Sequence, residues 1–327
     1  MQPSTILLNP AARGVGVSER RHPRAAPRRV KTCASAVQFS KYHGIGNDFI
    51  LVDNRGEVEP CMEADRAVEL CDRNFGIGAD GVIFALRAGN KDAHDFDMRM
   101  FNSDGSEPEM CGNGIRCLAR FISDLDGEGA KKYKVGTGAG LIQPELLENG
   151  QVRVDMGVPI LEPENIPVNS TPNTPDGKLV AKEVSIGGSE WTFTPVSMGN
   201  PHAVVFRKNG GLLKLDDVQL AEIGPQFETD ALFPAKVNTE FVELLGETSK
   251  VDRVRMCVWE RGAGATLACG TGACAIVVAG VLEGLTNSEC TVELPGGNLL
   301  IEWDQEGNNH VFMTGPAEFV FSGETSV

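Results

Sequence analysis

The sequence has no long apolar run and few aromatic side chains. No apolar stretch approaches the ~20 residues that a membrane-spanning helix needs. Aromatic residues make up only 6% of the chain, so a surface on which nucleic-acid bases stack is not expected. Glycine is abundant, with 38 residues, which indicates many turns and sites lined by backbone. With 327 residues, 41% of them hydrophobic, the chain is long enough for two domains with substantial cores.

The nine cysteines show none of the spacings that are typical of metal sites or disulfide scaffolds. The chain contains no Cys-x-x-Cys, and no histidine lies at zinc-finger spacing from the pairs Cys111/Cys117 and Cys269/Cys274. The odd number and the wide spacing also differ from the dense frameworks of small secreted domains. We therefore expect no metal site, and we expect most of these thiols to be reduced.

Acidic residues are nearly absent from the start of the chain, although the whole sequence has a net charge of −15. Residues 1–37 carry a net charge of +6, which leaves −21 on residues 38–327. This basic segment lacks the apolar centre of a secretory signal, so it is predicted to be a transit peptide that is cleaved near Cys33–Val37. Its serine and proline content and its uncharged first dozen residues favour the chloroplast stroma over the mitochondrion. The alternative is a basic arm for nucleic acid, which the acidic body would repel.

Hydrophobic periodicity predicts many strands and a few helices. Segment 63–75 places Ala67, Leu70, Cys71 and Phe75 on one face, which predicts a helix that ends at Gly76. The stretch 159–177 is rich in Pro, Asn and Thr and is predicted to be a loop. Further helices are predicted at 114–125, 217–228 and 272–282, and strands at 48–53, 81–86, 96–101, 141–147, 151–156, 191–198, 203–207, 239–245, 253–260 and within 289–321.

The sequence contains an internal repeat. In each half a Gly-Asn pair precedes a predicted strand, and a Cys-Gly-x-Gly motif follows at the start of a predicted helix. Two similar domains that face each other would bring both cysteine motifs to a common cleft. The alternative is a duplicated fold whose glycine-rich turns carry no chemistry. The repeated segments are GIGNDFILV (44–52) and MCGNGIRC (110–117) in the first half, and SMGNPHAVV (197–205) and ACGTGACA (268–275) in the second.

Two glycine-rich stretches imitate a dinucleotide-binding fingerprint. That fingerprint needs a strand before the glycines and a helix after them. GIGADG (76–81) has the reverse order, and GTGACA (270–275) follows a loop and lacks a parallel βαβ context. Nicotinamide binding is therefore not expected.

A Cys-Gly-x-Gly motif at the start of a helix combines an anion site with a reactive thiol. The first helical N–H groups have no partner within the helix, and glycine lets a carboxylate approach them closely. The same positive end favours the thiolate form of a neighbouring cysteine. Two such motifs on opposite sides of one α-carbon supply a base on one face and an acid on the other. This is the arrangement that racemisation or epimerisation needs.

The motifs resemble those of the diaminopimelate epimerase family, in a plastid form. HGIGNDF, FNSDGSEPEMCGNGIRC, SMGNPH, VNTEFVE and WERGAGATLACGTGACA occur in this order, and the resemblance covers roughly residues 38–325. It implies a mixed α/β fold of two pseudo-symmetric domains, each a mostly antiparallel sheet wrapped around a central helix. The implied domains are 38–157 with 314–327, and 158–313. The implied reaction interconverts LL- and meso-2,6-diaminopimelate in lysine synthesis, without a cofactor.

The resemblance also implies roles for individual residues. Cys111 and Cys269 correspond to the two catalytic thiols, and Arg261 to the bidentate partner of the distal carboxylate. His202 and Glu260 are expected to support the protonation states of the thiols. The residues expected to bind substrate are Asn47, Asn102, Gly112, Asn113, Asn200, Asn238, Glu260, Arg261, Gly270 and Thr271.

The chain departs from the family pattern at Gly81, where many members have Gln, and at Ala265, which replaces a common Glu. We assign no substrate contact to Gly81. The expected partner is a small-molecule substrate, with no nucleic acid and no membrane, and the sequence does not distinguish a monomer from a homodimer. Two other functions remain open. One is a related racemase or isomerase of this fold, similar to proline racemase, and the other is an amino-acid sensor without activity.

Overall fold

The structure is a computed structural model that describes residues 36–326, and these residues lie within one compact unit. The predicted transit peptide, 1–37, and its cleavage site lie outside the described residues, apart from Ala36 and Val37. No helix in the described part of the chain is both long and apolar enough to cross a membrane.

The first half forms a seven-stranded sheet in the order β20-β1-β2-β3-β4-β6-β7. Neighbouring strands are antiparallel, except that β2 runs parallel to β3 and β4 parallel to β6. Side chains alternate between the two faces, so Leu51 and Ile83 pack against helix α2 while Ile50 and Val82 pack against helix α1. The elements are β1 Val37–Gly44, β2 Asn47–Asn54, α1 Ala64–Cys71, β3 Gly81–Arg87, β4 Phe96–Asn102, α2 Gly112–Asp126, β6 Val135–Thr137, β7 Gly140–Ile142 and β20 Glu318–Thr325.

The second half forms a larger sheet in the order β10-β11-β12-β14-β15-β17-β18-β19-β9-β8-β5. Here β12 runs parallel to β14 and β15 parallel to β17. The elements are β5 Lys131–Lys132, β8 Glu145–Leu146, β9 Val152–Asp155, β10 Lys182–Ile186, β11 Ser189–Ser197, β12 Pro201–Lys208, β13 Gly211–Leu212, η1 Leu215–Asp217, α3 Leu220–Glu228, β14 Asn238–Leu244, β15 Val251–Glu260, β16 Gly264–Ala265, α4 Gly270–Leu282, β17 Thr286–Leu294, β18 Gly297–Trp303 and β19 Val311–Gly315.

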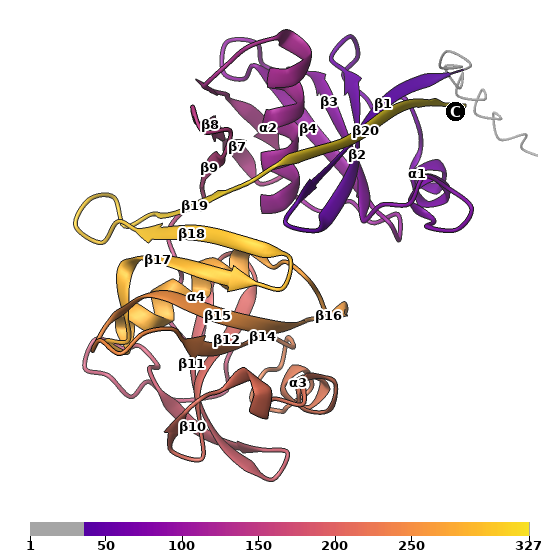
Figure 1. Ribbon diagram of the computed structural model, residues 1–327. Coiled ribbons are helices and arrows are strands. Elements are labelled where there is room, and N and C mark those ends of the chain that lie inside the picture. The colour runs from indigo at the N-terminus through magenta and orange to yellow at the C-terminus, as the bar shows by residue number, and fades with distance from the viewer. Residues whose placement is uncertain (1–35, 327) are drawn as a thin grey trace, which may run out of the picture. The chain divides into compact units, whose positions relative to one another are not determined.

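Each half contains one helix that begins at a Cys-Gly-x-Gly motif. Helix α2 lies beside the strands of the first sheet, and α4 packs against β11, β12, β17 and β18 of the second (Figure 1). Residues 273–279 of α4 are all fully buried, because a helix that is apolar on every side is stable only when protein surrounds it. The predicted fold, two sheet-rich halves each with a central helix, is confirmed.

The helix predicted at 63–75 is shorter than the periodicity indicated. Helix α1 ends at Cys71, because the carboxylate of Asp72 accepts hydrogen bonds from the backbone N–H groups of Asn74 and Phe75 and starts a turn. Phe75, which we expected on the buried face, is 95% exposed. The apolar pattern therefore overestimated the helix by one turn.

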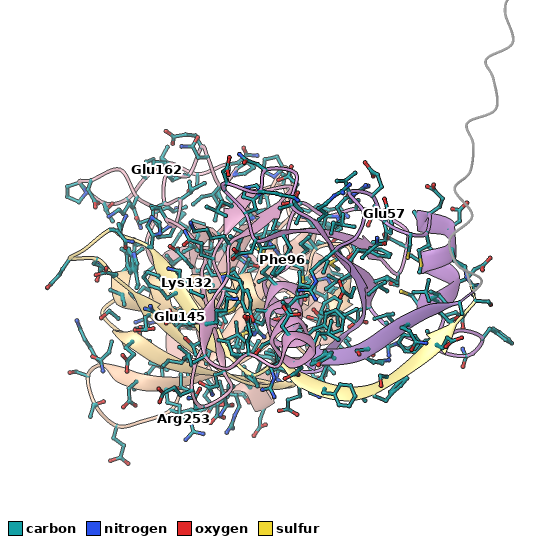
Figure 2. The ribbon with its side chains drawn as sticks, turned by 90° about the horizontal axis from the view of Figure 1, so that it is seen from above. Glu57, Phe96, Lys132, Glu145, Glu162 and Arg253 are labelled. Atoms are coloured by element: carbon teal, nitrogen blue, oxygen red, sulfur yellow. The ribbon has the colours of Figure 1, made fainter. Side chains whose placement is uncertain are left out.

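The C-terminal strand β20 pairs with β1, so the end of the chain lies in the first sheet. Strands β5, β8 and β9 lie within residues 131–155, before the predicted boundary, but they join the second sheet through β19. The domain boundaries near residues 157 and 313 remain a prediction. Charged side chains such as Glu57, Glu162 and Arg253 are exposed, whereas Phe96 is buried in the core of the first half (Figure 2).

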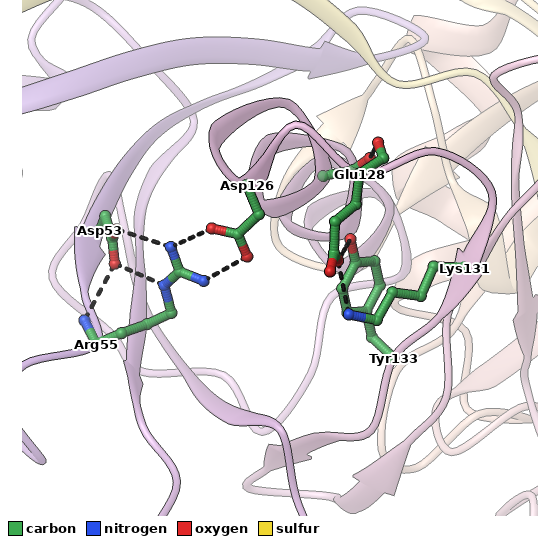
Figure 3. Close-up of polar contacts among 7 residues, drawn as sticks. Asp53, Arg55, Asp126, Glu128, Lys131 and Tyr133 are labelled. Atoms are coloured by element: carbon green, nitrogen blue, oxygen red, sulfur yellow. Dashed lines mark hydrogen bonds and ion pairs between the residues drawn. The ribbon is translucent and has the colours of Figure 1, made fainter.

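Charged contacts fix the C-terminal end of α2. Arg55 donates two hydrogen bonds to Asp126, at 2.8 and 2.9 Å, and two more to Asp53 at the end of β2, at 2.9 and 3.0 Å (Figure 3). Gly127 then ends the helix in the left-handed conformation, with φ of +66°. These contacts hold the helix from the end opposite to its cysteine motif.

Candidate active site

Cys111 is the N-cap residue of α2. Its backbone is extended, with φ −135° and ψ 117°, and its Sγ accepts a hydrogen bond from the N–H of Gly114 at 3.4 Å. Burial raises the pKa of this thiol. The N–H groups of Gly114 and Asn113 and the guanidinium of Arg116 act in the opposite direction, because they stabilise the thiolate.

A hydrogen-bond chain passes beside Cys111. The guanidinium of Arg116 donates to Asn113 Oδ1 at 3.0 Å, and the Asn113 amide donates to Asn47 Oδ1 at 3.0 Å. The Asn47 amide in turn donates to the carboxylate of Asp80 at 2.7 Å. Asn47 Oδ1 also lies 4.0 Å from the Sγ of Cys111. Asn47 and Asn113, both expected in the site, are thus held together beside the first thiol.

Cys269 is the N-cap residue of α4, and it is only 4% exposed. Its Sγ lies 3.6 Å from the hydroxyl oxygen of Thr271. Burial raises the pKa of this thiol well above its ordinary value, and the carboxyl groups of Glu260 and Glu240 raise it further. Burial likewise raises the pKa of Glu260, which hydrogen-bonds Thr266. The second thiol therefore lies in an acidic environment.

A second hydrogen-bond chain leads to Cys269. His202 Nδ1 lies 2.7 Å from Glu240 Oε1, and His202 Nε2 lies 3.0 Å from Asn200 Oδ1. The Asn200 amide donates to the hydroxyl oxygen of Thr271 at 3.3 Å, which leaves the Thr271 hydroxyl free to donate to Cys269. Parallel pairing of β12 with β14 places His202 and Glu240 on neighbouring strands. Both are fully buried.

Glycine at position 272 makes room for this arrangement. A Cβ there would lie 2.6 Å from Glu240 Oε1 and 3.1 Å from the Sγ of Cys269. The carboxylate and the thiol therefore reach the first turn of α4 only because the side chain is absent. The other carboxylate oxygen, Glu240 Oε2, is buried and has no hydrogen-bond partner among the described residues.

The first turns of the two helices meet over Met313 of β19. A Cβ on Gly112 would lie 3.0 Å from the methyl carbon of Met313, and a Cβ on Gly270 would lie 3.0 Å from its sulfur. Gly270 also approaches Asn113, whose Oδ1 would lie 3.6 Å from the same Cβ. The backbone N–H groups at both helix starts are thus close to one another, and together they form a positive region suited to one small anion.

The remaining residues expected in the site make structural contacts. Asn238 accepts the backbone N–H of Arg261 at 2.8 Å and donates to the carbonyl of Pro201 at 3.0 Å. The guanidinium of Arg261 is exposed and donates to the carbonyl of Ala235 at 3.1 Å. Asn102 donates to the Ser106 hydroxyl at 2.9 Å within a turn, and among residues 36–326 no hydrogen bond links its side chain to the other site residues.

The sequence analysis missed three charged residues of the site: Asp80, Arg116 and Glu240. Each lies within a segment that the sequence analysis quoted: Asp80 in GIGADG, Arg116 in MCGNGIRC and Glu240 in VNTEFVE. The available signal was that Arg116 and Glu240 interrupt apolar segments. His202, Glu240 and Cys269 also lie close enough to share a metal ion, with ligand atoms within 4.8 Å of one another. Both ring nitrogens of His202 already have hydrogen-bond partners, so we assign this group to a proton network and not to a metal.

Comparison with known proteins agrees with this geometry. Residues 39–162 and 194–320 match the family described as diaminopimelate epimerase. The chain belongs to the diaminopimelate epimerase family. It is 55% identical over 290 residues to the chloroplastic diaminopimelate epimerase of rice (Oryza sativa subsp. japonica), covering 88% of this chain and 80% of that one. It is 56% identical over 292 residues to the diaminopimelate epimerase of Synechocystis sp., covering 89% and 100% of the two chains. The chain is accordingly an isomerase of the epimerase class.

Solved structures of more distant proteins share the fold. A hydroxyproline epimerase from Agrobacterium vitis superposes with a TM-score of 0.58 at 16% identity, covering 90% of this chain and 92% of that one. A phenazine biosynthesis protein of the PhzF family from Bacillus anthracis gives a TM-score of 0.59 at 18% identity, covering 90% and 100%. At these identities the likeness concerns the fold alone. The fold of this diaminopimelate epimerase family member is therefore shared with proteins that are named for other activities.

Proposed function

We propose that the protein epimerises LL-2,6-diaminopimelate to the meso isomer with Cys111 and Cys269 as base and acid, without a cofactor. The observation that carries the proposal is the pairing of two N-cap thiols with two helix starts that meet over Met313. One α-carboxylate bound between these helix starts would lie within reach of both motifs. A substrate bound in this way would have its α-carboxylate in the anion site and its α-carbon beside both the base and the acid.

The chemistry follows from this placement. A thiolate on one face takes the α-proton and becomes a thiol, and the electron pair left on the α-carbon spreads into the bound carboxylate. The backbone N–H groups of Gly112, Asn113, Gly270 and Thr271 stabilise this charge as it develops. The thiol on the opposite face then gives its own proton to the α-carbon and becomes a thiolate. The configuration inverts, and the two cysteines have exchanged protonation states.

Recognition of the distal end of the substrate is assigned to polar side chains around the second motif. Arg261 is suited to a distal carboxylate because its guanidinium is exposed and bound only to one backbone carbonyl. Asn238 positions Arg261 through its backbone N–H, in addition to the substrate contact first expected of it. Sites that leave polar groups unpaired with a wrong substrate discriminate by ~10⁴-fold or more, so the DD isomer should be a very poor substrate.

The cellular place of the reaction is proposed on two grounds. The rice relative is named as chloroplastic, and residues 1–37 carry a net charge of +6 on an otherwise acidic chain. We therefore assign the protein to the chloroplast stroma, with residues 1–37 as the transit peptide, and its reaction to lysine synthesis.

The test is direct. The purified protein is incubated with LL-diaminopimelate without added cofactor, and the isomers are separated by chiral chromatography over time. Conversion to the meso isomer supports the proposal. L-Proline in a parallel reaction distinguishes a proline racemase, and tight binding of diaminopimelate without exchange of its α-hydrogen would indicate a sensor.

A further inference from the structure

Arg116 is a buried cation without a carboxylate partner. It lies in the first turns of α2, its side chain is fully buried, and no acidic group among residues 36–326 forms an ion pair with it. Its guanidinium donates to the carbonyls of Gly112 and Pro316, each at 3.3 Å, to Asn113 Oδ1 at 3.0 Å, and to the sulfur of Met313 at 3.5 Å. All its acceptors are neutral.

Such a placement is costly, because a charge that is removed from water is destabilised unless an opposite charge compensates it. Arg55, which follows β2 and contacts the C-terminal end of α2, shows the usual solution: it is partly exposed and paired with Asp53 and Asp126 (Figure 3). Arg116 remains charged, since a guanidinium does not lose its proton in proteins. The fold also makes space for it, because a Cβ on Gly44 would lie 2.9 Å from Arg116 Nη2.

The surroundings of Arg116 are positive as well. Its Met313 contact is the residue over which the first turns of α2 and α4 meet, so the guanidinium adds a full charge to two helix starts. Among the described residues, Glu240 reaches the first turn of α4 but pairs with His202. No carboxylate among these residues forms an ion pair with Arg116, so its charge at the start of α2 is left without a carboxylate partner. A bound anion at the helix starts would balance this charge, and under the proposed function this anion is the substrate α-carboxylate.

Arg116 also sets the direction of the hydrogen bonds beside Cys111. A guanidinium only donates and an ionised carboxylate only accepts. With Arg116 at one end and Asp80 at the other, the amides of Asn113 and Asn47 between them each have a single consistent orientation. Asn47 Oδ1 is then presented toward the Sγ of Cys111.

We propose that Arg116 is a positioning residue for the reaction: it orients Asn113 and Asn47 beside Cys111 and supplies the buried positive charge that the α-carboxylate of the substrate neutralises. The proposal rests on the proposed function for the identity of that carboxylate. The effect of Arg116 on Cys111 does not depend on it, because the contacts belong to the protein alone. The charged and titratable groups that act on these two residues are Glu260 on Cys111, and Cys117 and Cys274 on Arg116.

The first test needs no substrate. The rate at which iodoacetamide alkylates Cys111 is followed against pH by mass spectrometry, in the wild type, Arg116→Met and Arg116→Lys. Loss of the charge in Arg116→Met should raise the pKa of Cys111, so that a smaller fraction of this thiol is ionised near neutral pH. Alkylation there should slow by roughly tenfold. Arg116→Lys keeps the charge and should stay close to wild type. Arg55→Met is the matched control, because Arg55 follows β2 and contacts the opposite end of α2 through Asp126, and it should not alter the alkylation profile.

The second test uses turnover of LL-diaminopimelate. Arg116→Met should lower kcat by about 100-fold, in the range found when one donor to a developing anion is removed. Arg116→Lys keeps the charge but loses the guanidinium group that donates to Asn113. It should therefore raise KM while keeping the pH profile of the wild type. Arg55→Met should retain wild-type kcat and KM.

A folded Arg116→Met variant with wild-type alkylation and kinetics would overturn the proposal. If circular dichroism shows that Arg116→Met does not fold, the test of the proposal is made with Arg116→Lys instead. A Lys variant whose alkylation profile moves, or whose KM is unchanged, contradicts the assignment. If alkylation responds as expected but no protein converts diaminopimelate, the proposed function fails while the effect of Arg116 on Cys111 stands.

Discussion

The two cysteine motifs share a backbone design but differ in the charges around them. Both thiols occupy the N-cap of a helix that begins with Gly-x-Gly, and both are coupled to an asparagine that follows a glycine. The chain of hydrogen bonds near Cys111 begins at a cation, Arg116. The chain that reaches Cys269 begins at a carboxylate, Glu240.

This difference separates the protonation preferences of the two thiols. Burial raises the pKa of both thiols. Arg116 opposes this effect at Cys111, where Glu260 adds to it, whereas at Cys269 both Glu260 and Glu240 raise the pKa further. The thiolate form is therefore disfavoured more strongly at Cys269, whose pKa is raised well above its ordinary value, than at Cys111. Under the proposed function, duplication supplies two similar faces, and the surrounding charges would make Cys111 the more readily ionised of the two thiols.

Removing either thiol should have the largest effect. Cys111→Ala and Cys269→Ala each delete one partner of the proton transfer, so each should reduce epimerisation by about 10³-fold or more, measured by chiral chromatography. Cys117→Ala and Cys274→Ala are matched controls, because these thiols are fully buried and lie in the same helices. The controls should lose roughly 1 kcal/mol of stability and keep the activity. Near-normal conversion by either N-cap variant would contradict the two-base assignment.

Isotope exchange examines the same assignment without a mutation. In the proposed mechanism the base and the acid are different residues, so the proton that is removed is not the one returned. In D₂O, early product should carry deuterium at the inverted centre while the remaining substrate stays largely unlabelled, as measured by mass spectrometry. Early product that retains its original hydrogen would indicate a single base.

Glu240→Gln should reduce the difference in pKa between Cys111 and Cys269. Gln keeps an oxygen that accepts from His202 but removes a negative charge beside Cys269, so the pKa of Cys269 should fall. In the direction that needs Cys269 as the acid, its thiol then ionises at lower pH, and the alkaline limb of kcat/KM should move to lower pH. We expect a loss in kcat of roughly tenfold.

Thr271→Val is the comparison for Glu240→Gln, because it breaks the chain to Cys269 without a change in charge. It should reduce kcat and leave the position of the alkaline limb less affected. If both variants give the same profile, the charge of Glu240 has no part in setting the acid.

Sequence patterns predicted the fold and the two motifs because these depend on local rules. Glycines at helix starts, alternation in strands and an all-apolar helix are visible in a single sequence. The roles of Arg116 and Glu240 were not visible, because each depends on a partner distant in the sequence: Pro316 lies 200 residues after Arg116, and His202 lies 38 residues before Glu240. The prediction that Phe75 is buried was wrong for a different, local reason: the turn that Asp72 starts ended the helix although the apolar pattern continued.

The smallest effect is expected at the opposite end of α2, where charge contributes to stability and not to catalysis. Hydrogen bonds from Arg55 lower the pKa of Asp126, and they also lower the pKa of Asp53 against the opposing effect of burial. A carboxylate whose pKa is lowered by folding stabilises the protein above its unfolded pKa of about 4, and this stability is lost as the pH falls through the folded value. Because all three side chains are about one-third exposed, screening limits the contribution to about 1 kcal/mol. Arg55→Met should therefore lower the free energy of unfolding in urea by that amount at pH 7, with the difference shrinking toward zero below about pH 4. A difference that stays constant with pH would show that the methylene packing of Arg55, and not its charge, holds this end of the helix.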